Sequence, residues 1–225
     1  MTVTTDPLLR VEHLTRTEDG GSWDALLWRA GPGWRMVSSA VLGGGLGERA
    51  WVLNAQVRPG YARTDPAEHL AGIARSAGAA GPGVGLMTAA HVGEYGEAED
   101  EGVRAVATAG IGVTTWAAAP GPGAPGVPDP GTINIVVAVP APLADAALVN
   151  AVATATEAKV QALLEAGHHC SGTPTDAVCV AARTPAPGEA PELFAGPRSV
   201  WGARLARAVH RAVHASLGRR TGDPA

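Results

Sequence analysis

A lysine on the apolar side of a long helix is the first residue whose type and position require a chemical explanation. The run from Pro142 to Gly167 predicts that helix, which ends at a glycine cap. At 100° per residue, the polar face carries Asn150, Thr154, Glu157, Gln161 and Glu165. Lys159 lies on the other side, among Leu148, Val152, Ala155 and Leu163. A buried ammonium needs a carboxylate, a carbonyl or a ligand, so Lys159 could belong to a buried ion pair or to a site. Alternatively, its aliphatic stem packs against the apolar residues while the amine extends to the solvent at the edge of the core.

A loop rich in hydroxyl groups is the second candidate. The segment SGTPTD at 171–176 places three hydroxyls and the carboxylate of Asp176 just before an apolar strand that runs to Ala182. Such a loop can present hydroxyl oxygens and backbone N–H groups to a carbonyl, as acyl transfer requires. A network of turns that only holds the loop together accounts for the same residues.

Other polar groups stand in or near predicted strands. His91 follows the strand from Val84 to Ala90 and suits acid–base chemistry near neutral pH, although a lone loop histidine is more often structural. Asn54 closes one strand and Asn134 lies inside another, where either could orient an amide substrate or tie down a loop. Glu157 is ordinarily a solvated residue, and only its nearness to Lys159 in the sequence makes it a candidate.

Two further segments look like site motifs, but their spacing is wrong. His168, His169 and Cys170 are adjacent, whereas metal ligands are normally separated, so we expect no metal site. The glycine cluster at 43–47 lacks the Lys-Ser/Thr of a phosphate loop and predicts a bend or a close backbone approach. Cys170 and Cys179 are too few for a disulfide framework and are expected to be reduced thiols.

Composition narrows the class of protein. The chain has 225 residues, 46% hydrophobic and 17% charged, which is enough to bury a sizeable core. A net charge of −4 with both signs scattered along the chain argues against a nucleic acid or an anionic membrane as partner. No apolar run approaches the ~20 residues of a membrane span, and the first residues do not form a signal peptide. We therefore expect a cytoplasmic protein.

The elements that must position these residues alternate along the chain. Strands are predicted at 35–42, 50–54, 84–88, 103–113, 132–139 and 176–182, and helices at 66–79, 142–167 and 200–217. Asp65 and Glu68 predict a capping box at the first helix. The pattern indicates an α/β fold, a layered domain with a largely buried mixed β-sheet flanked by helices. We expect an N-terminal β segment at 1–34, the main domain at 35–218, a surface excursion at 120–130 and a flexible tail at 219–225.

Three motifs occur in a characteristic order: GTINI at 131–135, TEAK at 156–159 and SGTPTDAV at 171–178. Together they resemble the signature run of the adenosylcobinamide amidohydrolase family. Further similar segments are NAQVRPGYARTDP at 54–66, GLMTAAHV at 85–92 and GPRSVWGARLARAV at 196–209. The chain departs from the family pattern at Trp116, where a polar turn with an asparagine is expected, and at Pro174, because the usual ATGT is SGTP here.

The resemblance implies an enzyme that hydrolyses the amide between the corrin ring side chain and aminopropanol. The product would be adenosylcobyric acid, used in cobamide salvage. The corrinoid is then the substrate, no cofactor is expected, and a broad apolar cleft, to which tryptophans could contribute, must hold it. We expect no nucleic-acid or membrane partner, and a homo-oligomer is compatible with the sequence.

The mechanism written from these residues is a hypothesis. Asp176 or Glu157 activates a water or Thr175, Lys159 and Asn134 stabilise the oxyanion, and His91 protonates the departing amine. Substrate-binding roles are expected for Asn134, Asn54, Thr173 and Thr132. Two alternatives stay open: a non-catalytic corrinoid-binding domain, and an unrelated hydrolase with a self-cleaving threonine nucleophile, suggested by Thr173 and Thr175. Lys159, Asn134 and Asp176 are expected to converge at one cleft.

Overall fold

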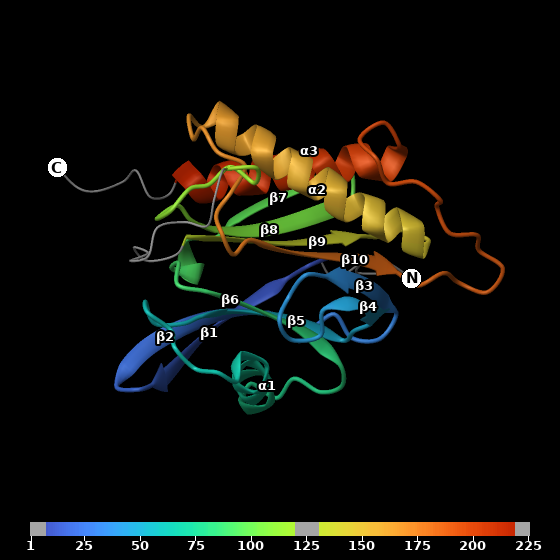
Figure 1. Ribbon diagram of the computed structural model, residues 1–225. Coiled ribbons are helices and arrows are strands. Elements are labelled where there is room, and N and C mark those ends of the chain that lie inside the picture. Colours follow the sequence, from blue (N-terminus) through green and yellow to red (C-terminus); the bar gives the residue numbers. More distant parts are fainter. Residues whose placement is uncertain (1–7, 120–130, 219–225) are drawn as a thin grey trace.

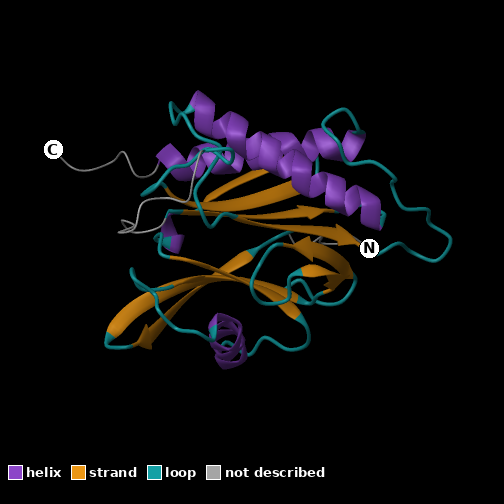
Figure 2. Cartoon of the chain, in the orientation of Figure 1, coloured by secondary structure: helices purple, strands orange, loops and turns teal. Residues whose placement is uncertain are grey.

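The computed structural model describes residues 8–119 and 131–218, and within them the chain forms four layers (Figures 1 and 2). One sheet has the strand order β1 (Val11–Glu18), β2 (Gly21–Trp28), β5 (Trp51–Gln56), β6 (Gly83–Thr88). The other has the order β4 (Gly45–Glu48), β3 (Trp34–Ser38), β10 (Ala177–Arg183), β9 (Thr132–Val139), β8 (Val103–Gly110), β7 (Gly96–Asp100). The helices are α1 (Pro66–Ser76), α2 (Asp145–Glu165) and α3 (Val200–Gly218), with a short 3₁₀ turn, η1 (Val92–Glu94).

Helices cover the outer face of each sheet. Figure 1 shows α2 and α3 against the six-stranded sheet and α1 against the four-stranded sheet, as their contacts confirm. Parallel pairing of β5 with β6 and of β9 with β10, among otherwise antiparallel pairs, makes both sheets mixed. The predicted α/β class is therefore confirmed, and the strands divide between two sheets. None of the described helices is long and apolar enough to cross a membrane.

The two strands predicted around the glycine cluster end in different sheets. β3 turns back and pairs with β4, which the cluster itself forms, while β5 pairs with β2 and β6. Gly43 has φ +67°, and a Cβ there would lie 1.9 Å from the carbonyl oxygen of Gly83. Leu42 also exchanges backbone hydrogen bonds with Gly85 of β6. The cluster is thus a close backbone approach that joins the sheets, as the sequence predicted.

The strand β9 separates the two interiors of the molecule. All eight of its residues are buried. Ile133, Ile135, Val137 and Val139 pack with the helices, whereas Val136 and Ala138 pack between the sheets. Because side chains alternate along a strand, Thr132 and Asn134 also face the space between the sheets. This alternation determines which polar residues can reach a site there.

Several local expectations need correction. Asp65 makes no capping hydrogen bond at α1 and instead pairs with Arg63, at 2.9 and 2.8 Å, so the capping box does not form. Thr154, expected on the polar face of α2, is buried, and its hydroxyl is satisfied by donating to the carbonyl of Ala195. The surface excursion at 120–130 and the tail at 219–225 lie outside the described residues, and the division at residue 34 stays a prediction.

Three arginines on one side of α3 pair with acidic residues at the end of β7. Asp100 accepts hydrogen bonds from Arg207 and Arg211, and Glu101 pairs with Arg204. The two hydrogen bonds from Arg207, and then the one from Arg211, hold the pKa of Asp100 below its ordinary value of 3.8, although burial opposes this. The arginines on this side of α3 therefore attach the helix to the end of β7, and they also remain in contact with solvent.

We predict that Asp100→Asn lowers the free energy of unfolding by about 1–2 kcal/mol at pH 7, because two charge-assisted contacts are lost. The folded pKa lies below the unfolded one, so the contribution is present above about pH 4 and is lost as the pH falls through the folded pKa. Thermal unfolding at pH 7 and pH 3 measures this, and the two proteins should differ less at pH 3. Glu68→Gln, which breaks an exposed pair with Arg75, is the control with little effect at either pH. An equal loss at both pH values would contradict the prediction.

Candidate active site

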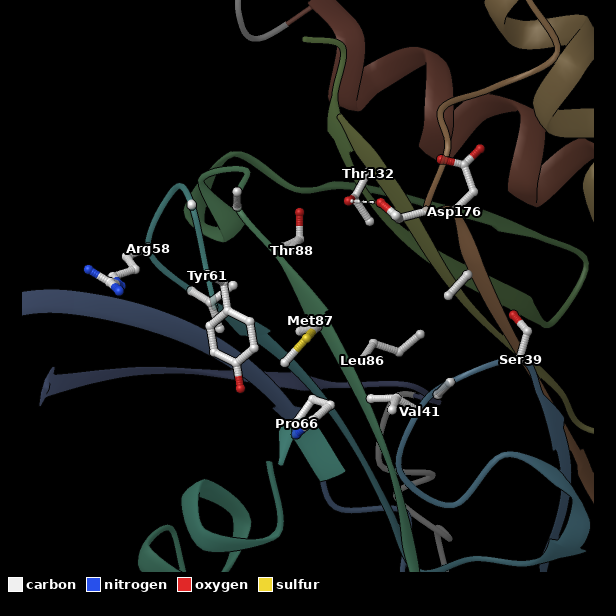
Figure 3. A pocket seen from close by; sticks show the side chains of 16 residues that line it. Ser39, Val41, Arg58, Tyr61, Pro66, Leu86, Met87, Thr88, Thr132 and Asp176 are labelled. Atoms are coloured by element: carbon white, nitrogen blue, oxygen red, sulfur yellow. Dashed lines mark hydrogen bonds between the residues drawn. The ribbon is translucent and has the colours of Figure 1, made fainter. Parts of the chain in front are cut away.

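A cavity of about 520 Å³ opens where the C-terminal ends of β5 and β6 meet the N-terminal ends of β9 and β10 (Figure 3). Its walls come from four segments: residues 39–41 after β3, the loop at 57–66, residues 86–89 at the end of β6, and Thr132 with residues 175–177. Aliphatic side chains such as Val41, Val57 and Leu86 line much of it. The hydroxyl-bearing residues Ser39, Thr88, Thr132 and Thr175 also line it.

The carboxylate of Asp176 ties the loop at 171–176 to its surroundings. Its Oδ2 is 2.5 Å from Nζ of Lys159 and accepts from the backbone N–H of Thr173 at 3.2 Å. Its Oδ1 accepts from the backbone N–H of Ile133 at 2.9 Å and from the hydroxyl of Thr173 at 2.5 Å. A carboxylate offers about four acceptor positions, and these donors fill them. Asp176 is therefore an anchor rather than a free base.

Lys159 is buried, with 6% of its surface exposed, so the expectation of a buried pair is met and the snorkelling alternative is not. The side chain of Lys159 extends from α2 to Asp176, just before the N-terminal end of β10. The backbone of Gly172 leaves the room for this contact, because a Cβ there would lie 2.2 Å from Oδ2 of Asp176 and 2.6 Å from Nζ of Lys159. Figure 3 shows the Asp176 side chain directed away from Met87 and Leu86, on the far side of the cavity.

Two threonine hydroxyls face each other at the polar end of the cavity. Oγ1 of Thr132 is 2.6 Å from Oγ1 of Thr175, the contact drawn in Figure 3. Thr175 also donates to the carbonyl of Gly131 at 3.1 Å. The hydroxyl oxygen of Thr173 lies 2.7 Å from the same carbonyl, but its single proton goes to the closer, charged acceptor, Asp176. Hydroxyl protons rotate to suit their partners, so this pair can donate to or accept from a bound ligand.

The two asparagines form a separate network between the sheets. Nδ2 of Asn134 donates to Oδ1 of Asn54 at 2.8 Å and to the carbonyl of Met87 at 3.0 Å, and Asn54 donates to Thr108. Both donors of Asn134 are thus engaged, and its buried Oδ1 has no hydrogen-bond partner among the described residues. Lys159 and Asp176 form an ion pair, whereas Asn134 lies elsewhere, bound to the carbonyl of Met87 in β6. Asp176 lines the cavity, but Lys159 and Asn134 are not among the described residues that line it, so the expected convergence of all three at one cleft does not occur.

The remaining predicted residues lie outside this network. His91 is exposed and precedes η1, with Nδ1 3.4 Å from the side chain of Gln56. Glu157 is exposed on α2 and lies 200° around the helix from Lys159. Both cysteines are buried free thiols, and burial raises the pKa of Cys179 to about 12. No trio of His, Cys, Asp or Glu side chains gathers closely enough to hold a metal ion within the described ranges.

The family model for adenosylcobinamide amidohydrolases matches residues 10–225 of the chain. The chain belongs to this family. A protein of Methanosarcina mazei named adenosylcobinamide amidohydrolase is 34% identical over 185 residues, 80% of this chain and 88% of that protein. One of the same name from Halobacterium salinarum is 43% identical over 91 residues, 40% of this chain and 38% of that protein.

Solved structures show lower similarity. The PH0078 protein of Pyrococcus horikoshii aligns with a TM-score of 0.48 and 16% identity, over 93% of this chain and 84% of that one. The L-aminopeptidase D-Ala-esterase/amidase of Ochrobactrum anthropi aligns with a TM-score of 0.44 and 14% identity, over 93% and 83%.

Membership of the adenosylcobinamide amidohydrolase family makes the protein a hydrolase that acts on an amide bond. This favours the enzyme over the alternative of a non-catalytic binding domain. No tryptophan is among the described residues that line this cavity, and a contribution of tryptophans to a corrinoid cleft stays a prediction. The aromatic residue at its wall is Tyr61.

Sequence reasoning also missed Ser39, Arg58, Tyr61 and Thr88, which line the cavity of the amidohydrolase. A signal was available for two of them, because Arg58 and Tyr61 lie in the family-like segment NAQVRPGYARTDP. Trp116 is 49% exposed, and its neighbour Thr115 exchanges backbone hydrogen bonds with Gly172 and Ser171. The segment that departs from the family pattern therefore packs on the site loop.

We predict that Lys159→Met lowers the free energy of unfolding by about 3 kcal/mol, because it removes the ammonium partner of the partly buried carboxylate of Asp176. The double variant Lys159→Met, Asp176→Asn should be more stable than the sum of the two single changes by about 1–3 kcal/mol, since neither charge then remains unpaired. Denaturant unfolding of the four proteins measures this coupling. Additive losses would show that the pair does not determine the stability of this region.

Proposed function

We propose that the cavity binds adenosylcobinamide with its aminopropanol-bearing amide at the Thr132–Thr175 pair, and that the enzyme releases adenosylcobyric acid and the amino alcohol. The observation that carries the proposal is this hydroxyl pair, which stands at the polar end of a largely aliphatic cavity. The family and the names of the relatives supply the substrate. A role in corrinoid salvage within the cytoplasm follows from that substrate and is part of the proposal.

The size of the cavity suits part of the substrate. Cavities of 300–1,000 Å³ bury drug-sized ligands, and adenosylcobinamide is larger than these. A cavity of about 520 Å³ therefore takes the amide arm and one edge of the macrocycle, while the rest of the corrinoid stays outside. The aliphatic side chains of Val41, Val57 and Leu86 are suited to the ring edge. Arg58 is at the wall, next to the amide-rich periphery of the ligand.

The roles of the polar residues follow from their bonds. Thr132 can turn its hydroxyl from Thr175 to the amide oxygen, where such a donor stabilises the developing oxyanion. Thr175, oriented by the carbonyl of Gly131, accepts a hydrogen bond from the attacking water. Asp176, with Lys159 behind it, keeps both threonines in place through Ile133 and Thr173. These two residues are positioning residues in this proposal, which replaces the hypothesis of Asp176 as base and Lys159 as oxyanion donor.

His91 remains the proposed proton donor to the departing amine. It lies two residues beyond Ala89, which lines the cavity. In this proposal the imidazole of His91 takes the proton that the attacking water loses and returns it to the departing amine, so the step balances. Glu157 has no part in the proposal, because its side of α2 faces solvent. Asn54 and Asn134 support the β6 wall through the carbonyl of Met87 rather than contact the amide.

We predict that the purified protein converts adenosylcobinamide to adenosylcobyric acid, and that Thr132→Val and Thr175→Val each lower kcat by ~10²-fold or more. Each valine keeps the shape of threonine and removes the hydroxyl. The serine variants at the same positions restore the hydroxyl and should stay within ~10-fold of the unmodified enzyme. Chromatography of the products with time measures the rate.

Thr156→Val is the matched control, because the hydroxyl of Thr156 is exposed on α2 and bonds only to the carbonyl of Val152 among the described contacts. It should turn over substrate at the normal rate. Thermal unfolding checks that every variant is folded. Valine variants with normal turnover would remove the hydroxyl pair from the reaction, and no turnover by the unmodified protein would refute the proposed substrate. A purified chain that mass spectrometry finds cleaved would instead favour the self-cleaving alternative.

A further inference from the structure

A chain of three polar side chains lies behind the cavity wall formed by the loop at 57–66. Nδ1 of His69, on α1, is 2.9 Å from the hydroxyl of Tyr61, and the two rings stack at 8° with their centroids 5.6 Å apart. Nε2 of His69 is 2.7 Å from Oε1 of Glu18, at the end of β1. Nε2 has no hydrogen-bond partner among the described residues, and its contact with Glu18 is an ion pair when the imidazole is protonated. His69 is 8% exposed, and the proposed reaction does not use it.

Tyr61 presents its ring, rather than its hydroxyl, to the cavity. Figure 3 shows the hydroxyl directed away from Thr132 and Asp176, while the ring stands along the wall. The loop from Val57 to Asp65 contains no helix or strand, although Val57, Arg58, Gly60 and Tyr61 all line the cavity. The position of the ring therefore depends on side-chain contacts, and these include the stack and the hydrogen bond with His69.

Glu18 is the anchor of the chain. It pairs with Arg16 at 3.2 Å and lies 3.9 Å from Arg63, in addition to its contact with His69. Burial alone would raise the pKa of Glu18, but His69 and then Arg16 outweigh it and hold the pKa below the usual value. The carboxylate is thus charged at neutral pH and favours a proton on Nε2 of His69. Nδ1 is then left to accept the hydrogen bond of Tyr61 when the imidazole is neutral.

We propose that Tyr61 is a specificity-determining contact for the edge of the corrin ring that enters the cavity, and that His69 and Glu18 are positioning residues that hold the tyrosine ring against the cavity. The inference rests on the proposed function, because that function supplies the ligand. An aromatic ring has a large face and few rotatable bonds, so it contacts a conjugated macrocycle at low entropic cost. Fixing the ring before the ligand arrives lowers that cost further.

The test is a double-mutant cycle on KM and on corrinoid affinity. Tyr61→Ala should raise KM for adenosylcobinamide ~10-fold and leave kcat within ~3-fold, because the ring contacts the macrocycle and not the amide. Glu18→Gln should raise KM ~3-fold in the unmodified enzyme and should have no further effect in the Tyr61→Ala background, because Glu18 acts through the tyrosine.

Tyr61→Phe should resemble Glu18→Gln, since it keeps the ring and removes its link to His69. Tyr95→Phe, at the other tyrosine, is the matched control with normal KM; Tyr95 is not among the described residues that line the cavity.

A titration of binding with adenosylcobyric acid, which carries the macrocycle without the scissile amide, separates this inference from the proposed function. If Tyr61→Ala binds it ~10-fold more weakly while the unmodified protein hydrolyses nothing, the proposed function fails and the ring contact stands. If hydrolysis occurs and folded Tyr61→Ala has normal KM and affinity, the inference fails alone. Equal KM changes from Glu18→Gln in both backgrounds would also overturn it, because a purely structural role of Glu18 predicts that result.

Discussion

The carboxylate of Asp176 is the constraint on which the site depends. Four donors from three parts of the chain converge on it: Lys159 from α2, Ile133 from β9, and the backbone and hydroxyl of Thr173 from its own loop. A charge this deeply placed is costly unless it is fully paired, so the loop, the helix and the strand must hold their relative positions for the network to form. Through that network the Thr132–Thr175 pair is set at the end of the cavity.

A saturated carboxylate also changes the chemistry that the site can perform. Because Asp176 has no acceptor position to spare, the polar groups that can respond to a ligand are the hydroxyls, whose protons rotate. The two asparagines are likewise committed, with both N–H donors of Asn134 bound to Asn54 and Met87. The charged groups at the cavity are Asp176, whose oxygens are engaged by protein donors, and Arg58, while the neutral hydroxyls of Thr132 and Thr175 remain able to turn towards a ligand. This arrangement suits an uncharged amide substrate.

The two-sheet architecture explains how a cavity arises at this place. The buried side chains of β9 point alternately towards the helices and into the space between the sheets. The two sheets are joined at Leu42 and Gly43. Beyond the ends of the paired strands, the loop at 57–66 forms one side of the cavity, although this loop belongs to no helix or strand. Its side-chain anchor, from Tyr61 through His69 to Glu18, reaches back to β1. The N-terminal strands thus contribute to the site although they contain none of the residues that line it in the described structure.

Local patterns in the sequence determined the elements and the burial of their key residues. The β-branched run at 132–139 matched β9 residue for residue, and helical periodicity placed Lys159 on the buried side of α2. The order SGTPTD showed which loop carried the hydroxyls. Periodicity could not show that β3 would pair with β4 and leave β5 to another sheet, that Asp65 would bind Arg63 instead of capping α1, or that Asn134 would meet Asn54. Nor could it place Tyr61 at the cavity. Those outcomes were decided by the tertiary structure, because strand pairing and polar contacts between distant segments depend on which partners the packed layers bring within reach, and no local pattern records that.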